Sequence, residues 1–182
     1  SLKIFGAQEK VIFLGGDHSI SFSTTKAFLE HCKKGKKKPC LIVFDAYGDC
    51  MPAMKEPTHE EWLHAVVEGG FPSENILLVG TRNLDREEII FLKKKNIRII
   101  SMNQLNENLQ ETCDIIMEFA NGKEKELYLS IDIDVVDPGF APATGYAEPG
   151  GLTSRQFIYL IQRINKIKNL KAIDIVEINE KK

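Results

Sequence analysis

Acidic residues and a histidine follow three short apolar runs of this chain. They stand in the segments 15–18 (Gly-Gly-Asp-His), 45–49 (Asp-Ala-Tyr-Gly-Asp) and 132–134 (Asp-Ile-Asp). Each run is typical of a buried strand, and strand ends form the edge of an open α/β sheet where ligands bind. One imidazole and four carboxylates at that edge would suit manganese or magnesium, and could also hold zinc, nickel or iron. These are the side chains of His18, Asp45, Asp49, Asp132 and Asp134.

The spacing of the carboxylates favours metal-assisted chemistry. Asp132 and Asp134 are two residues apart on an extended segment, so both side chains point the same way. If 45–49 is also extended, Asp45, Tyr47 and Asp49 share a face. Like charges this close are costly unless a cation neutralises them. A bridged pair of ions would also lower the pKa of a shared water and give hydroxide near neutral pH.

The bulk composition is that of an ordinary globular protein. The chain has 182 residues, 43% of them hydrophobic and 27% charged, and we expect residues 1–182 to form a single domain. A net charge of -2 argues against a general nucleic-acid binder. We see no bilayer-spanning stretch and no signal peptide, and the four cysteines contain no CxxC pair. We therefore expect a cytoplasmic protein with reduced, structural thiols, and neither a membrane nor a nucleic acid as partner.

Strand and helix patterns alternate along the chain. We expect strands at 11–14, 41–44, 76–79, 97–100, 127–131 and 172–176. Helices are expected at 20–33, from Thr58 to the Gly69-Gly70 pair, from Asp85 onward, at 109–120 and at 153–166. Capping boxes support three of these helix starts. Such alternation predicts a mainly parallel sheet with helices on both faces.

Right-handed crossovers would bring the carboxyl ends of all these strands to one edge of the sheet. The residues expected there are His18, Asp45, Asp49, Asp85, Asp132, Asp134 and Glu177. The segment 134–151, rich in proline and glycine, has no clear pattern, and a structureless stretch of that length is usually functional. For Asp17, Asp85 and Asp137 the alternative of a helix cap or a turn stays open.

The same segments resemble the three signatures of the ureohydrolases, the arginase and agmatinase family. The resemblance rests on residues 15–19, 45–49 and 130–138, continues through 140–145 and 150–153, and runs from about Lys10 to the end of the chain. It implies a three-layer α/β/α sandwich. It also implies hydrolysis of a guanidino compound to urea and an amine by metal-bound hydroxide, with two Mn²⁺ ions. Relatives cleave agmatine, guanidinobutyrate or formiminoglutamate.

The resemblance also implies roles for individual residues. One ion would be surrounded by His18, Asp45, Asp49 and Asp132, and the other by Asp45, Asp132 and Asp134. Asp49 would also orient the hydroxide, and Glu177 would pair with the guanidinium, since a carboxylate accepts two parallel hydrogen bonds. His59 stands about where the family has a proton-shuttling histidine, although it could equally be an exposed residue of a first helical turn. Asp85 matches a position that contacts the substrate's amino end, or serves only as a cap.

Tyr47 departs from the family pattern, because it stands where relatives have a metal-binding histidine. A neutral phenol, with an ordinary pKa near 10, is a poor ligand. We therefore predict that the second ion binds more weakly than is usual for the family.

Two further departures concern length and the substrate loop. Only residues 1–10 precede the first signature, and the chain ends just after Glu177. Compared with the family it lacks an N-terminal strand and helices and a final helix, which indicates a fragment or a remodelled member. A missing strand would leave apolar surface that partner subunits could cover. The loop at 50–54 is mostly apolar, without the polar pattern by which arginases hold arginine's α-amino acid end.

Two functional hypotheses follow. The first is a metal-dependent hydrolase of guanidino or amidine C–N bonds. The second is a non-catalytic or metal-impaired relative with a structural or oligomer-forming role, which lost turnover when histidine became Tyr47. Other hydrolases on this scaffold, including deacetylase-like enzymes, remain a third possibility. By analogy with the family we expect a small guanidino substrate and a homo-oligomer, a trimer or hexamer.

Overall fold

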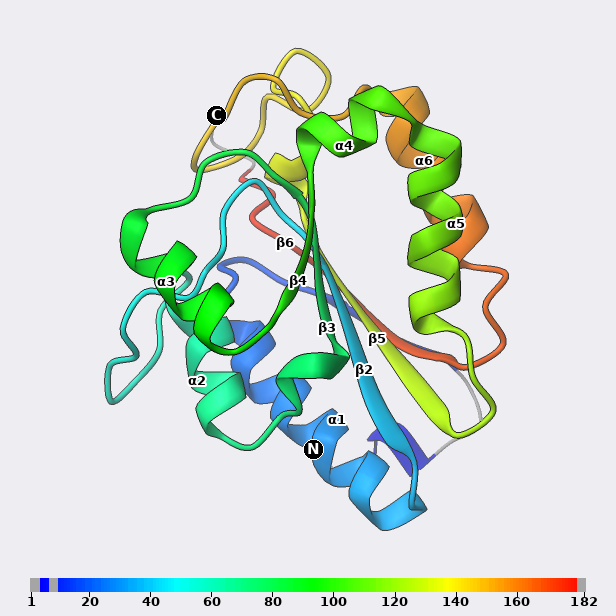
Figure 1. The fold of residues 1–182 in the computed structure, drawn as a ribbon. Coiled ribbons are helices and arrows are strands. Elements are labelled where there is room, and N and C mark those ends of the chain that lie inside the picture. The colour runs from blue at the N-terminus through cyan, green and yellow to red at the C-terminus, as the bar shows by residue number, and fades with distance from the viewer. Residues whose placement is uncertain (1–3, 7–9, 180–182) are drawn as a thin grey trace.

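The architecture was examined in a computed structural model that describes residues 4–6 and 10–179. All described strands belong to one parallel sheet with the order β1-β6-β5-β2-β3-β4 (Figure 1). The strands are β1 (Val11–Leu14), β2 (Lys38–Phe44), β3 (Ile76–Thr81), β4 (Arg98–Ser101), β5 (Lys125–Asp132) and β6 (Leu170–Val176). The parallel sheet predicted from the sequence is confirmed, with each strand within a few residues of its expected bounds.

Helices cover both faces of the sheet. They are α1 (Ile20–Gly35), α2 (Trp62–Glu68), α3 (Arg86–Lys94), α4 (Met102–Glu107), α5 (Leu109–Ala120) and α6 (Ser154–Ile164). Three short 3-10 turns, η1 (Ile4–Gly6), η2 (Ser73–Asn75) and η3 (Ile133–Val135), complete the described elements. One buried cluster joins the sheet to α1, α2 and α3, and a second joins it to α4, α5 and α6. The three-layer α/β/α sandwich is therefore confirmed.

Hydrogen bonds at the helix starts follow the sequence closely. Capping boxes form at Asp85 and Thr153, as predicted. The helix expected from Thr58 begins only at Trp62, although Glu61 does accept hydrogen bonds from the Thr58 N–H and hydroxyl. None of the described helices is both long and apolar enough to cross a bilayer.

β1 differs from the buried strand expected there. It lies at the edge of the sheet and its side chains alternate between partly buried and exposed positions. Ile12 is 60% exposed and Leu14 is 80% exposed. An edge strand with one bare face has the same apolar run as a buried one, so the sequence alone could not distinguish the two.

The strand order places the functional segments at a switch point of the sheet. The chain runs outward from β2 through β3 to β4 and then returns to the other side of β2 with β5. In doubly wound sheets the crevice at such a reversal is where ligands bind. The pairing of Phe44 with Ile131 brings the ends of β2 and β5 together, so Asp45 and Asp132 are neighbours. Glu177 follows β6 beside them.

Candidate metal centre

The buried imidazole of His18 is the meeting point of three carboxylates. Its Nδ1 atom lies 3.3 Å from Asp45 Oδ2, 2.9 Å from Asp49 Oδ2 and 3.2 Å from Asp132 Oδ2. Ligand atoms of His18, Asp45 and Asp132 lie within 4.8 Å of one another, the spacing of a metal site. His18 follows β1, Asp45 and Asp49 follow β2, and Asp132 ends β5. The structure thus brings together side chains from the ends of three strands.

The other imidazole nitrogen shows which tautomer His18 adopts. Nε2 lies 2.9 Å from the Ser130 hydroxyl, which itself donates to Asp174 at 2.7 Å. Asp174 is fully buried and also accepts hydrogen bonds from the hydroxyls of Ser21 and Tyr128. Because Ser130 gives its proton to Asp174, it accepts one from His18 Nε2. When His18 is neutral, the lone pair of Nδ1 therefore faces the carboxylates.

Asp49 is held in a left-handed conformation at φ 50°, which is uncommon for a non-glycine residue. Its Oδ2 accepts the indole N–H of Trp62 at 2.8 Å, and its carbonyl accepts the N–H of Leu63 at 3.0 Å. The Trp62 ring also packs 4.7 Å from the His18 ring. These contacts with the start of α2 turn the carboxylate toward His18.

Glu177 is the second site residue with positive φ, at 61°. Its N–H donates to the Gly16 carbonyl at 2.7 Å, and its Oε1 accepts the backbone N–H of His18 at 2.6 Å. Half-burial, followed by the nearby carboxylates, raises the pKa of Glu177 although the hydrogen bond from His18 opposes this. Strain of this kind is typical of functional sites and persists because the surroundings hold it.

Burying the ionised carboxylates of this cluster close together costs free energy unless a cation neutralises them. Burial and the neighbouring negative charges raise the pKa of Asp45 to about 7 and that of Asp134 to about 10. Burial lowers the pKa of His18, but the close carboxylates of Asp132, Asp45 and Asp49 outweigh it and raise that pKa well above its usual value. His18 Nδ1 and Asp45 Oδ2 also lack a well-formed hydrogen bond. Buried oxygens and an imidazole lone pair converging in this way fit a hard or borderline divalent cation.

Asp134 lies beside this cluster and is oriented by the backbone. Its Oδ1 accepts the N–H of Ala46 at 3.0 Å, and its own N–H donates to Asp132 Oδ1 at 2.9 Å. Asp134 is buried like Asp45 and Asp132, but it does not belong to the compact ligand group of His18, Asp45 and Asp132.

Tyr47 lines a small pocket with Asp49, Asp132 and Asp134, but its hydroxyl bonds a residue outside the cluster. Because Asp49 is in the left-handed region, 45–49 is not a continuous extended segment, and the shared face considered above does not form. The Tyr47 hydroxyl donates to Glu148 Oε2 at 3.0 Å. Burial, then the Glu148 carboxylate, raises the pKa of Tyr47, so the phenol stays protonated. The Tyr47 hydroxyl is thus bonded to Glu148 rather than to a carboxylate of the cluster.

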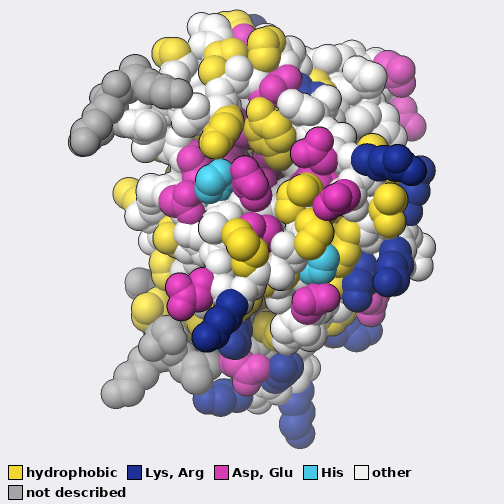
Figure 2. Space-filling view, turned by 90° about the vertical axis from the view of Figure 1, so that its left-hand side faces the viewer, with side chains coloured by type: hydrophobic (Ala, Val, Ile, Leu, Met, Phe, Trp, Pro, Cys, Tyr) yellow, Lys and Arg dark blue, Asp and Glu magenta, His cyan; other side chains and the backbone are white. Residues whose placement is uncertain are grey.

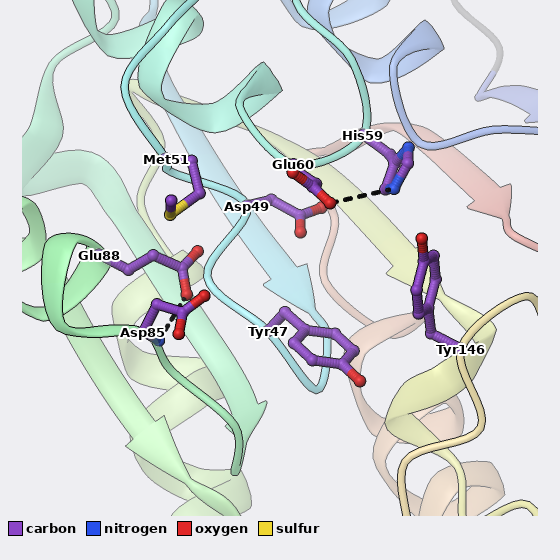
Figure 3. A pocket seen from close by; sticks show the side chains of 8 residues that line it. All are labelled: Tyr47, Asp49, Met51, His59, Glu60, Asp85, Glu88 and Tyr146. Carbon is purple, nitrogen blue, oxygen red and sulfur yellow. Dashed lines mark hydrogen bonds and ion pairs between the residues drawn. The ribbon is translucent and has the colours of Figure 1, made fainter.

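An open cavity adjoins the cluster on a face where acidic side chains gather, with lysines and arginines toward its edges (Figure 2). Asp85 lies in its wall while also capping α3, so the two roles considered for it are compatible. Figure 3 shows the eight lining side chains, which are Tyr47, Asp49, Met51, His59, Glu60, Asp85, Glu88 and Tyr146.

His59 stands in the wall of this cavity and is paired with Asp17. Its Nδ1 lies 3.1 Å from Asp17 Oδ2, and its buried Nε2 makes no hydrogen bond but lies 3.9 Å from Glu60 Oε1. Partial burial opposes the shift, but hydrogen bonds to Ser19 and the nearby His59 lower the pKa of Asp17. Asp17 therefore both closes a turn, by accepting the N–H of Ser19 at 2.9 Å, and orients His59.

Comparison with known proteins identifies this architecture. The sequence profile described as "Arginase family" matches residues 2–181. An arginase of Schizosaccharomyces pombe is 30% identical over 194 residues, an alignment that covers 94% of this chain and 58% of the relative. The chain belongs to the arginase family.

Solved structures agree with this assignment. An arginase of Entamoeba histolytica superposes with a TM-score of 0.86 at 25% identity, covering 98% of this chain and 67% of that one. A formimidoylglutamase of Bacillus subtilis gives a TM-score of 0.85 at 27% identity, covering 93% and 53%. This arginase-family chain thus spans between about half and two thirds of the length of these relatives.

Three residues around the site were not singled out from the sequence of this family member. Ser130 and Asp174 each stand between two apolar residues of a strand, and this signal could have identified them. Trp62 carries no such signal, because an aromatic residue at a helix start is ordinarily core. Each contacts a proposed ligand through a hydrogen bond or, for Asp174, through Ser130.

Proposed function

We propose that this chain is a metal-dependent hydrolase of a linear C–N bond in a guanidino or related amidine cation, releasing urea from a guanidino substrate. The observation that supports it most is the convergence of three buried carboxylates on His18 Nδ1, each within 3.3 Å. Family membership supports the same class of reaction. Hard oxygen ligands with one imidazole make Mn²⁺ the proposed cation.

The proposed ligands divide into two sets. His18, Asp45, Asp49 and Asp132 would hold the first ion, and Asp134 would join Asp45 and Asp132 at the second. Without an imidazole from position 47, the second set is all carboxylate, and we expect it to bind more weakly. Bound cations would supply Lewis acidity and lower the pKa of a water molecule toward neutrality.

The remaining residues would bind the substrate and move protons. Glu177 offers a carboxylate oxygen beside the cluster, suited to a guanidinium N–H pair. Asp49, fixed by Trp62, would orient the attacking water. His59, with Asp17 on Nδ1 and Glu60 3.9 Å from Nε2, would donate a proton to the leaving amine. Asp85 would face the distal end of the substrate.

The test is urea or ammonia release from a panel of guanidino and formimino compounds after loading with Mn²⁺. We expect turnover of at least one compound, abolished by Asp132→Asn. The matched control is Asp114→Asn, which changes an exposed aspartate on α5. Lack of turnover across the panel by a manganese-loaded chain would contradict the proposal.

The orientation of Tyr47 favours a second candidate, a metal-binding relative without turnover. The variant Tyr47→His separates the two. If it creates urea release that the natural chain lacks, the second candidate is supported. If the natural chain already turns over and the change has little effect, the hydrolase stands.

A further inference from the structure

The segment 137–151, called the strap below, is folded rather than loose. Asp137 pins both of its ends, because its carboxylate accepts the N–H groups of Gly139 at 2.8 Å and Gly150 at 2.8 Å. Bridges from Val136 to Leu152 and from Thr144 to Ile178 fasten it to the rest of the sheet edge.

The middle of the strap is held by Glu148. One oxygen, Oε2, accepts the Tyr47 hydroxyl at 3.0 Å and the Asn83 amide at 3.2 Å. The Glu148 carbonyl accepts from Arg82 Nη2 at 2.6 Å, and the same nitrogen donates to the Asp134 carbonyl at 2.6 Å. A single strap residue is thereby joined to the loops that follow β2, β3 and β5.

Tyr146 stands two residues before Glu148 in the strap and contacts two rings of the cavity wall. Its ring centroid lies 6.4 Å from that of Tyr47, edge to face, and 5.6 Å from that of His59. In Figure 3 the Tyr47 hydroxyl turns away from Asp49 and toward the segment that carries Tyr146, whose ring is one of the lining side chains. Tyr146 is 57% exposed, so its ring is available to a ligand.

We propose that Tyr47, with Glu148 and Asn83, forms a latch that seats Tyr146 in the cavity wall, and that Tyr47 is a positioning residue rather than a metal ligand. A phenol donating to a carboxylate makes a strong, directional hydrogen bond. Tyr47 would have to break it to turn toward Asp134. The seated ring offers a π-face to a cationic substrate. That last role rests on the proposed function, whereas the latch does not.

Hydrogen exchange by mass spectrometry, on the metal-loaded chain without substrate, tests the latch. The variants are Tyr47→Phe, which removes one oxygen, Glu148→Ala and their combination. We expect exchange of peptides spanning 144–149 to accelerate about tenfold in each single variant, since the bond involves a charged acceptor. The double variant should be no faster than the faster single one. Tyr159→Phe on α6 is the matched control and should leave these peptides unchanged.

Metal content, measured on the same samples, distinguishes the latch from the alternative that Tyr47 is a metal ligand. A latch predicts that Tyr47→Phe binds as much manganese as the natural chain. Loss of manganese in Tyr47→Phe would identify a ligand and overturn the proposal, as would unchanged exchange at 144–149. If the natural chain turns over no guanidino compound while the variants still loosen the strap, the proposed function fails and the latch stands.

Discussion

His18 Nε2 and the Ser130 hydroxyl lie 2.9 Å apart, and the Ser130 hydroxyl donates a hydrogen bond to the buried Asp174. In neutral His18 this contact places the ring proton on Nε2, so that the Nδ1 lone pair faces Asp45, Asp49 and Asp132. A lone pair among three carboxylates is repulsive until a cation lies between them. In the proposed metal centre, Ser130 and Asp174 would orient His18 for a cation without being ligands themselves.

Removing the Ser130 hydroxyl should weaken the cation site. Ser130→Ala leaves His18 Nε2 without its acceptor and frees the ring to change tautomer. We expect Mn²⁺ affinity to fall about 10- to 100-fold, measured by calorimetry. Ser23→Ala, which removes an exposed serine of α1, serves as the control. Equal affinity in Ser130→Ala and the natural chain would show that the contact does not orient His18.

The stability of the metal-free chain should depend on pH through this cluster. The pKa values of Asp45, about 7, and Asp134, about 10, lie above the ordinary 3.8, so the folded state holds these protons more tightly. Their contribution to the stability of the folded chain is present near pH 4 and is lost as the pH rises through 7 and toward 10. His18, with its raised pKa, acts in the same direction. We expect the metal-free Tm to fall from pH 5 to pH 9.

Adding Mn²⁺ should restore the Tm that the metal-free chain loses at higher pH. Binding requires deprotonated ligands, so the gain in Tm on adding Mn²⁺ should be larger at pH 8 than at pH 5.5. Thermal scans with and without chelator measure both effects. A metal-free Tm that rises between pH 5 and pH 8 would contradict the assigned pKa shifts.

Glu177 should matter for the substrate rather than for the metal. Glu177→Gln keeps an acceptor for the His18 N–H but removes the charge that would face a guanidinium. We expect kcat/KM to fall about 10- to 100-fold with manganese content unchanged. Glu74→Gln, on η2, is the control. A loss of bound metal in Glu177→Gln would instead place this residue among the ligands.

The cavity should select against a carboxylate on the substrate tail. Its lining includes Asp85, Glu88 and Glu60, and among the described residues that line it there is no lysine or arginine. Arg82, the nearby cation, is occupied by the Glu148 and Asp134 carbonyls. We expect guanidino compounds with a neutral or cationic tail to exceed arginine in kcat/KM by about tenfold or more. Arginine as the better substrate would refute this reading of the cavity.

Much of the fold could be predicted, because strand–helix alternation and capping boxes are local signals. α5 has the predicted bounds, 109–120, and β2, β3, β5 and β6 are each slightly longer than predicted. α4 was not predicted, although Ser101 and Gln104 form a capping box there. A six-residue helix shows too little periodicity to be recognised from apolar spacing.

The site was less predictable wherever it depends on distant partners. His18, Asp45, Asp49, Asp132 and Asp134 share strand ends, so their proximity follows from topology. The direction of Tyr47 does not, because its partner Glu148 is 101 residues away on a segment without a pattern. The pairing of His59 with Asp17 likewise joins two loops through a tertiary contact that no local spacing encodes.

The measurement that tests this account most directly is manganese per chain after loading with Mn²⁺ and dialysis. The natural chain, Asp132→Asn and the surface control Asp114→Asn would be compared. We predict one tightly held ion in the natural chain and in Asp114→Asn, a second ion only at higher free Mn²⁺, and none retained by Asp132→Asn. A natural chain that retains no manganese would contradict the metal centre. Two tightly held ions would contradict the claim that the second site is weak because Tyr47 is not a ligand.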